Sequence, residues 1–303
     1  MSFSRRQLLA GIAMGGMSLR PGEAQLRAGD GPKSRTSPAV CLYSQVLIKV
    51  GYDELGPLLK SLGVDGCDLT VMPGGHVDPQ QAGLHLMRAV EAITGVGLDV
   101  PVLSTAYTSL ADRTLNLVAG VAHEMGVPLL RAGDWTYSPE GEIEPRLMEV
   151  QRDINALASL ARAAEMTVVL RNVPGEIGGA LWDTHMMIRG IDPRLIGYDF
   201  DAGSAAATSG PGWDTVLRLV LPRIRMVTAR DCYWGKDPAG AWKAMPCPLG
   251  EGMVDWRKLF AALARVRFTG PISVPQDYHP KDELGAIRRD VEFLKKQLAA
   301  AYG

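Results

Sequence analysis

Hydrophobic and polar positions alternate between two patterns from residue 39 to the end of the chain. Short apolar segments predict buried strands, and longer segments with apolar residues three and four positions apart predict helices. The predicted strands are residues 40–44, 66–71, 102–106, 128–132, 167–171, 195–200, 225–229 and 272–274. The predicted helices are residues 52–62, 82–93, 115–125, 146–164, 213–221, 255–266 and 282–298.

Eight apolar strands that alternate with helices are typical of a closed parallel sheet with both faces covered. We therefore predict the α/β class and a single (β/α)8 TIM barrel over residues 39–303. The alternative is an open, doubly wound sheet, which would carry a glycine-rich phosphate loop after its first strand. The segment AVCLYSQVLIKVGYD, residues 39–53, contains no such loop. In a barrel, functional side chains are expected at the carboxyl ends of the strands.

The first 38 residues follow a different pattern. Arg5 and Arg6 precede an apolar stretch over residues 8–19, which is too short to span a bilayer as a stable helix. This arrangement resembles a twin-arginine export signal, and the alternative is an ordinary amphipathic N-terminus with chance arginines. Residues 20–38 are polar and rich in Gly, Pro and Arg, as a cleavage region and linker should be. We predict a signal peptide and linker over residues 1–38, and hence a periplasmic or secreted protein.

Charge and cysteine content narrow the possible partners. The chain has 303 residues, 47% of them hydrophobic, and a net charge of −1. A near-neutral chain without a basic block argues against nucleic acid as a partner, and nothing indicates membrane binding after signal cleavage. Four cysteines in a chain of this size are no disulfide framework. Cys232 and Cys247 flank one loop, however, and could pair in an oxidising compartment.

The residues at the predicted strand ends are polar and aromatic. Carboxylate and amide groups bind hydroxyls, and the faces of tryptophan or tyrosine stack on the C–H surfaces of sugars. Trp135 and Trp234 are the stacking candidates, with ordinary packing as the alternative. These residue types favour a small-molecule carbohydrate as the partner, although any barrel rim is polar because it faces water.

Five segments follow one another in a characteristic order. They are GVDGCDLTVMPGGHVDP (63–79), VVLRNVPGEIG (168–178), IGYDFDAGS (196–204), VTARD (227–231) and PLGEGMVDWRKLF leading to FTGPISV (248–274). With these segments, residues 40–298 resemble the xylose-isomerase-like barrel superfamily of sugar isomerases and epimerases, which also contains metal-dependent apurinic endonucleases. The stretch Gly-Glu-Gly-x-Val-Asp before a Gly-x-Ile-Ser strand is the most specific part of the resemblance.

The resemblance also implies a divalent metal at the top of the barrel. Its ligands would be a Glu ending strand five, an Asp ending strand six, a His from strand seven and a Glu ending strand eight. The metal would polarise the carbonyl and hydroxyl of the substrate while a carboxylate moves a proton at the adjacent carbon. Here Arg171 occupies the strand-five position, Thr228 occupies the strand-seven position, and Asp201 alone matches. We therefore predict no cofactor, with an unorthodox metal set of His76, Asp201 and Asp277 as the open alternative.

An arginine at the inner end of a buried strand needs an anionic partner, because an unpaired buried charge is costly. We expect Arg171 to stand where the charge of the metal would stand, paired with Asp201 across the barrel mouth or with an anionic or carbonyl group of the ligand. The predicted catalytic residues are Asp201 and His76 as acid and base and Arg171 as electrostatic stabiliser. The predicted substrate-binding residues are Asn172, Arg230, Asp231, Trp135, Trp234 and Asp277. The alternatives are a structural ion pair for Asp201, loop packing for His76 and a rim ion pair for Arg230.

We predict an exported carbohydrate isomerase, epimerase or related lyase that acts on a sugar or keto-sugar by proton transfer next to a carbonyl. The alternative is a non-catalytic barrel that has lost the metal site and kept a sugar-binding pocket. A third hypothesis, a metal-dependent DNA endonuclease, requires several metal ligands and a positively charged surface. One matched ligand and a slightly negative chain argue against it. The sequence leaves the sugar and the oligomeric state open.

Overall fold

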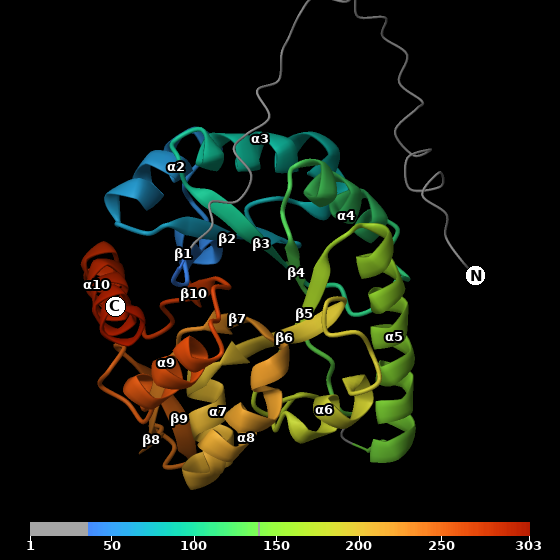
Figure 1. Cartoon of the computed structure of the whole chain (residues 1–303), viewed down its shortest axis with the longest axis vertical. Coiled ribbons are helices and arrows are strands. Elements are labelled where there is room, and N and C mark those ends of the chain that lie inside the picture. The colour runs from blue at the N-terminus through green and yellow to red at the C-terminus, as the bar shows by residue number, and fades with distance from the viewer. Residues whose placement is uncertain (1–35, 139) are drawn as a thin grey trace, which may run out of the picture.

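The structure, a computed structural model, describes residues 36–138 and 140–303. The predicted strands form a closed parallel barrel in the order β1-β10-β7-β6-β5-β4-β3-β2, which confirms the TIM barrel prediction (Figure 1). The barrel strands are β1 (Val40–Tyr43), β2 (Gly66–Val71), β3 (Asp99–Thr105), β4 (Leu129–Arg131), β5 (Thr167–Arg171), β6 (Ile196–Asp201), β7 (Ile224–Thr228) and β10 (Ile272–Val274). Residues 1–35, which carry most of the predicted export signal, lie outside the described residues.

Helices surround the barrel and cover the outer face of its strands (Figure 1). They are α2 (Tyr52–Ser61), α3 (Ala82–Thr94), α4 (Thr114–Glu124), α5 (Ile143–Ala163), α6 (Trp182–Ile188), α7 (Ala202–Ser209), α8 (Trp213–Val220), α9 (Trp256–Arg265) and α10 (Glu283–Tyr302). The sequence did not predict α6 and α7. Helix α7 has the sequence AGSAAATS, in which small residues stand where large apolar ones would mark a helical period. Within the described part of the chain, no helix has the length and apolar character needed to cross a membrane.

The inner face of the barrel has an apolar layer followed by a polar one. The apolar layer is a small cluster separate from the main core, formed by Val102, Leu129, Val169 and Met226. Side chains alternate between the two faces of a strand, so residues two positions further along point to the same inner face. Those residues are Ser104, Arg131, Arg171 and Thr228. The interior therefore becomes polar and charged toward the carboxyl ends of the strands.

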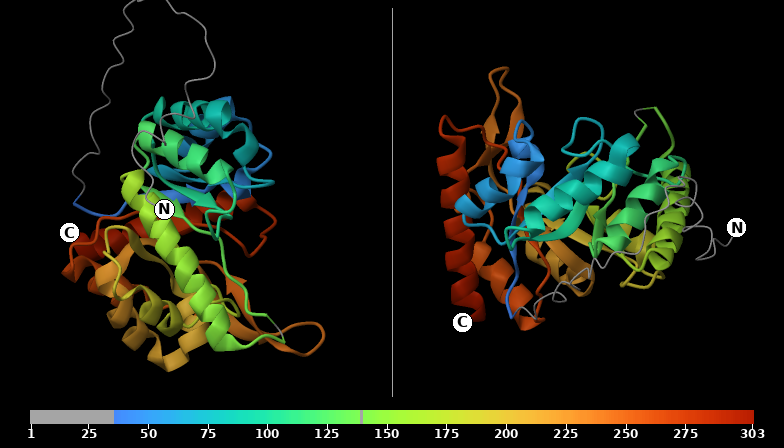
Figure 2. Two further views of the ribbon diagram at one scale, coloured as in Figure 1. Left: turned by 90° about the vertical axis from the view of Figure 1, so that its right-hand side faces the viewer. Right: turned by 90° about the horizontal axis from the view of Figure 1, so that it is seen from above.

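An antiparallel hairpin follows β7 and is not part of the barrel. Its strands, β8 (Asp231–Lys236) and β9 (Trp242–Cys247), pair only with each other in the described sheets. Figure 2 shows this hairpin, in orange, standing out beyond the barrel. The sequence predicted a loop here, because glycine and proline interrupt the segment and obscure its strand pattern.

Candidate functional site

One arginine lies deep inside the barrel between two aspartates. Nη1 of Arg131, at the end of β4, lies 3.5 Å from Oδ2 of Asp68 on β2 and donates a 3.4 Å hydrogen bond to Oδ2 of Asp199 on β6. The ring of Tyr43 packs on the guanidinium, with its centroid 4.9 Å away. Burial lowers the pKa of Arg131, but the two carboxylates outweigh burial and raise the pKa above its ordinary value.

Three hydroxyl groups complete the surroundings of the two carboxylates. Ser104 and Ser273 donate hydrogen bonds to the two oxygens of Asp68, the latter at 2.6 Å. The hydroxyl of Thr228 lies 2.8 and 2.9 Å from the two oxygens of Asp199. Burial raises the pKa of Asp199 in spite of the nearby guanidinium. We call these residues the Arg131 cluster (Asp68, Ser104, Arg131, Asp199, Thr228 and Ser273), and it joins six of the barrel strands.

A second arginine bridges two aspartates at the mouth of the barrel. Nη1 of Arg230, which follows β7, donates a 3.2 Å hydrogen bond to Oδ2 of Asp201, the last residue of β6. Nε of Arg230 forms a 3.0 Å ion pair with Oδ2 of Asp277, which follows β10. Burial raises the pKa of Asp277, Arg230 lowers it in part, and the charge of Asp201 raises it further. We call these three residues the mouth cluster.

Both the side chain and the backbone of Asp201 are held in place by hydrogen bonds. Its Oδ1 accepts a 2.9 Å hydrogen bond from the backbone N–H of Ser204 and so caps the N-terminus of α7. The side chain of Asn172 donates to the Asp201 carbonyl at 3.0 Å and accepts from the Asp201 N–H at 2.8 Å. Asn172 is completely buried. Its amide therefore fixes the end of β6, and its role in substrate binding stays a prediction.

Arg171 has an anionic partner, but not the one that the sequence predicted. Its Nη2 lies 2.9 Å from Oδ2 of Asp134, in the loop after β4. Asp201 is paired with Arg230 instead, so the expected ion pair between Arg171 and Asp201 is corrected. The expectation that a guanidinium at this strand end needs an anion is met by Asp134.

Three buried donors at the strand ends form no hydrogen bond within the described chain: Nε of Arg171, Nε2 of Gln276 and Nε of Arg230, whose contact with Asp277 is an ion pair only. Gln276 lies two residues beyond β10, is 9% exposed and has a φ of 39°. A positive φ is strained for a residue other than glycine, and such strain is frequent at functional sites. Donors of this kind suit a ligand rich in carbonyl, hydroxyl or carboxylate oxygens.

Asp231 holds the base of the hairpin rather than a ligand. It is 1% exposed. Its carboxylate accepts hydrogen bonds from the backbone N–H groups of Cys232, Gly250 and Val254, and from the indole N–H of Trp256. These contacts are structural, and the substrate contact of Asp231 stays a prediction. The same hydrogen bonds fold the Gly-Glu-Gly turn around this one carboxylate.

The two predicted stacking residues have opposite environments. Trp135 is 4% exposed and donates from its indole N–H to the carbonyl of Thr108 at 3.1 Å. It packs in the core, in agreement with the alternative of ordinary packing, and its role as a stacking surface stays a prediction. Trp234, on β8 of the hairpin, is 48% exposed. It remains a candidate for contact with a ligand.

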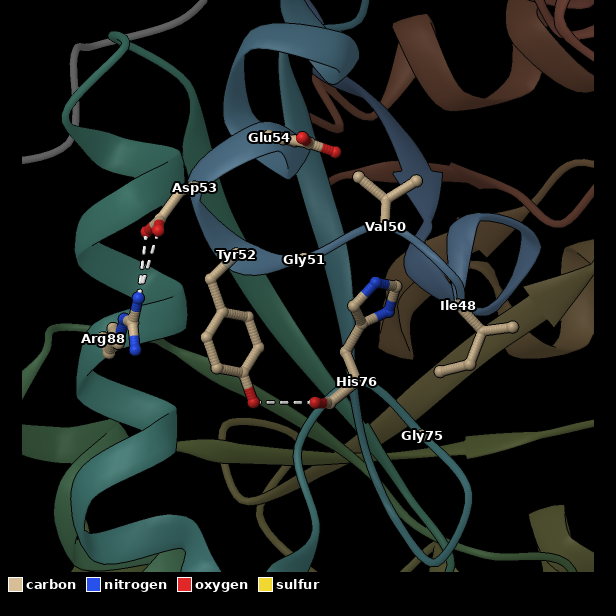
Figure 3. Close-up of a pocket in the computed structure, with 9 residues that line it drawn as sticks. All are labelled: Ile48, Val50, Gly51, Tyr52, Asp53, Glu54, Gly75, His76 and Arg88. Carbon is tan, nitrogen blue, oxygen red and sulfur yellow. Dashed lines mark hydrogen bonds and ion pairs between the residues drawn. The ribbon is translucent and has the colours of Figure 1, made fainter.

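His76 lies in a separate cavity of about 560 Å³ between the β1–α2 and β2–α3 connections (Figure 3). Its carbonyl accepts a 2.8 Å hydrogen bond from Tyr52, and burial lowers the pKa of its imidazole in spite of the nearby carbonyls of Val50 and Leu47. No residue of the mouth cluster lines this cavity. The structure thus places His76 in a different cavity from Asp201, and its role as acid or base beside Asp201 stays a prediction.

The residues at the mouth do not fit a divalent metal. In residues 36–138 and 140–303, no group of three or more His, Cys, Asp or Glu side chains is arranged to hold a metal ion. The alternative set of His76, Asp201 and Asp277 is therefore not assembled. The guanidinium of Arg230 stands between the two aspartates, where its positive charge would repel a cation.

The cysteines of the described chain are all free and buried. In the hairpin register, Cys232 lies opposite Pro246, and Cys247 lies opposite Asp231. Adjacent register positions point to opposite faces of a two-stranded sheet, so the two thiols face away from each other. The possible pairing of Cys232 with Cys247 is not formed.

Comparison with known proteins identifies a matching family model and solved structures with a similar fold. A family model described as a xylose isomerase-like TIM barrel matches residues 57–297. Among solved structures, a xylose isomerase-like TIM barrel protein from Mycobacterium smegmatis in complex with magnesium is 17% identical, with a TM-score of 0.67; 88% of this chain and 98% of that chain are covered. No curated protein matches the sequence.

Two sugar epimerases share the same fold. The 3-keto-D-glucoside 4-epimerase from E. coli is 16% identical, with a TM-score of 0.67, over 86% of this chain and 100% of that one. A D-allulose 3-epimerase from Methylomonas sp. is 15% identical, with a TM-score of 0.66, over 86% of this chain and 98% of that one. At these identities the similarity establishes the fold, and the chemistry must be argued from the site.

Proposed function

The chain belongs to the xylose isomerase-like TIM barrel family, and from that premise we propose that it acts on a sugar or keto-sugar at the mouth of its barrel. The reaction would be an isomerase-type or epimerase-type proton transfer at the carbon next to a carbonyl. The fold is shared with a 3-keto-D-glucoside 4-epimerase and a D-allulose 3-epimerase, whose names describe reactions of this class.

The bridge that Arg230 makes between Asp201 and Asp277 carries the proposal. Asp201 ends β6 and Asp277 follows β10, and the resemblance expects metal ligands from these two strands. We propose that the guanidinium has taken over the place and part of the charge of the metal. It supplies fixed N–H donors toward the oxygen atom on which negative charge develops, and such donors stabilise an enolate without a metal ion.

Asp277 is the better proton acceptor of the two aspartates. Its side chain is 37% exposed, whereas Asp201 is completely buried and also caps α7. Its raised pKa brings its basicity closer to that needed for abstraction of a carbon-bound proton. In the proposed step, the carboxylate of Asp277 accepts the proton, the C–H electron pair forms the enolate, and Arg230 and Arg171 offset the charge on its oxygen. A proton from solvent then adds to the opposite face of the same carbon and re-forms the carbonyl, which gives the epimer, and Asp277 releases its proton to solvent.

A non-catalytic sugar-binding barrel is the second candidate, and one observation favours it. The carboxylates at the mouth are engaged in ion pairs: Asp134 with Arg171, and Asp201 and Asp277 with Arg230. A carboxylate held by arginine must give up this ion pair before the oxygen that makes it can accept a proton from a substrate. Such a site would still bind hydroxyl groups, so binding without turnover is its expected behaviour.

Solvent-deuterium exchange separates the two candidates. The full-length protein is incubated in D2O with a panel of keto-sugars, and loss of the C–H signal next to the carbonyl is followed by NMR. We expect exchange by the native chain and a decrease of about 10²- to 10⁴-fold in Asp277→Asn. The matched control is Asp53→Asn, a 79% exposed aspartate paired with Arg88 outside the mouth, which should leave the rate unchanged.

Two further outcomes have definite meanings. Calorimetric binding of a keto-sugar without exchange would replace the isomerase proposal with the binding barrel. Exchange that EDTA abolishes and magnesium restores would overturn the substitution of the metal by Arg230, since the proposed site requires no metal ion.

We also propose that the chain is exported, because Arg5 and Arg6 precede a short apolar stretch as in a twin-arginine signal. Substitution of both residues by lysine should keep the protein in the cytoplasm. Unchanged appearance of the double variant in the periplasm or medium would contradict this route.

A further inference from the structure

The β8–β9 hairpin exposes aromatic side chains to an unusual degree. Tyr233 and Trp234 are each 48% exposed, and Trp242 is 64% exposed. A two-stranded hairpin is only marginally stable by itself, and large exposed aromatic residues close together usually mark a binding surface. These side chains have no role in the core of the barrel, so their exposure requires another explanation.

The register places the two tryptophans on one face of the hairpin. Trp234 lies opposite Ala244, and Lys236 lies opposite Trp242. Residues two positions apart on a strand share a face, so Trp234 and Trp242 are diagonal neighbours about 7–8 Å apart at their Cα atoms. Ala244 is small and leaves the face of Trp234 uncovered. The ammonium group of Lys236 lies 5.5 Å from the ring centroid of Trp242.

The base of the hairpin is fixed next to the mouth cluster. Strand β8 begins at Asp231, immediately after Arg230, and the four hydrogen bonds to the Asp231 carboxylate hold that end of the strand. Trp234 follows Arg230 by four residues, which is about 13 Å along an extended strand. This distance is longer than a single pyranose ring. A ligand that reaches from Arg230 to Trp234 therefore contains more than one sugar unit.

We propose that Trp234 and Trp242 form a stacking platform for the outer units of an oligosaccharide or glycoside whose reacting unit lies at the mouth cluster. The inference rests on the proposed function and specifies its substrate class. The apolar C–H faces of pyranose rings pack on the indole faces, while their hydroxyl groups remain in water. Lys236, packed against Trp242, offers a donor to these hydroxyls.

The platform is too small to bind a second copy of this chain as a stable dimer by itself. With about 150–250 Å² for a fully exposed aromatic side chain, the two tryptophans present on the order of 200 Å². A stable dimer buries about 800 Å² on each partner. Lys236 and Lys243 interrupt the apolar surface on the two faces of the hairpin, as expected for a surface that stays hydrated around a polar ligand.

Calorimetry with a ladder of sugars tests the platform. A keto-sugar or its parent monosaccharide is compared with the corresponding di- and trisaccharides, on the native chain, Trp234→Ala, Trp242→Ala and the control Trp182→Ala. Trp182 is 51% exposed on α6, so its substitution removes an exposed indole from another element. We expect the longer sugars to bind the native chain more tightly, and each hairpin variant to lose about 3- to 10-fold in affinity for them alone.

The outcomes separate this inference from the proposed function. Equal affinity for mono- and trisaccharides, or equal losses in the control variant, would overturn the platform and leave the mouth site intact. Trisaccharide binding that requires Trp234 but not Arg230 would support the platform and overturn the proposed function. Absence of binding throughout the ladder would overturn both. A dimer that Trp234→Ala dissociates, without change in sugar affinity, would reassign the hairpin to contact between subunits.

Discussion

Two arginines of this barrel each bridge a pair of aspartates, in surroundings that differ sharply. The side chain of Arg131 is 5% exposed, and both of its partners are completely buried. The side chain of Arg230 is 26% exposed, and its partner Asp277 is 37% exposed. The first bridge lies in the barrel interior, and the second lies at the carboxyl ends of the strands.

The difference indicates how the same ionic group can serve the scaffold in one place and the proposed site in another. In the Arg131 cluster, three hydroxyl groups bind the carboxylates as well, so the polar groups satisfy one another and leave little to offer a ligand. At the mouth, the Asp277 carboxylate is partly open to solvent. Buried, fully bonded networks fix a structure, whereas a partly exposed pair can exchange its partners for those of a ligand.

The largest expected effect is on stability, from Arg131→Met. The substitution leaves Asp68 and Asp199 buried without their cation, which should lower the free energy of unfolding by about 3–5 kcal/mol. Urea unfolding followed by circular dichroism at neutral pH measures the loss. If the methionine variant does not fold, Arg131→Lys retains a charge without the planar guanidinium and should show an intermediate loss.

The matched control for Arg131 is Arg88→Met. Arg88 also pairs with an aspartate, Asp53, but the two side chains are 61% and 79% exposed. Water screens such a pair, so the expected loss is at most about 1 kcal/mol. Equal losses in the two methionine variants would contradict the assignment of the Arg131 cluster to the scaffold.

The next largest effect is expected in Arg230→Met, which should weaken sugar binding more than it lowers stability. Since water can reach the position of this guanidinium, we expect a stability loss of only about 1–2 kcal/mol. Loss of a charge-assisted donor should weaken sugar binding by about 10-fold or more. Urea unfolding and calorimetry on the same preparation measure both quantities. A loss of stability as large as that of Arg131→Met, without a change in affinity, would make the mouth cluster a second scaffold element.

The strand–helix alternation predicted the fold because each barrel strand is an apolar segment with a distinct end. Strand β5 has the predicted bounds, Thr167–Arg171. The β8–β9 hairpin escaped prediction because its exposed aromatic residues alternate within a segment broken by glycine and proline. Helix α7 escaped because its small residues show no apolar period. The spacing of hydrophobic residues predicts an element only where that element buries one face with large apolar side chains.

The site could be predicted only as a set of strand ends. The sequence placed Asp201, Arg230 and Asp277 near one another, but not the partner that each long arginine side chain reaches. Arg171 extends to Asp134, and Arg230 extends to Asp201. Asp68 was missed, although a charged residue within the apolar strand GCDLTV is a usable signal, because a buried carboxylate needs a partner.

The smallest expected effect is a change in the pH dependence of stability, and it concerns the open end of the mouth cluster. Burial raises the pKa of Asp277 above its ordinary value of 3.8, so the folded state holds this proton more tightly than the unfolded state. As the pH rises above 3.8 and through the raised pKa, the contribution of Asp277 to the free energy of unfolding therefore falls.

Asp277→Asn has no carboxyl group to ionise, so its stability relative to the native chain should increase with pH over this interval. Urea unfolding of both proteins at several pH values between about 3.5 and 7 measures the difference. A relative stability that decreases with pH would show that the ion pair with Arg230 outweighs burial. Asp277 would then act mainly as a structural partner of Arg230, which would argue against its proposed role as a proton acceptor.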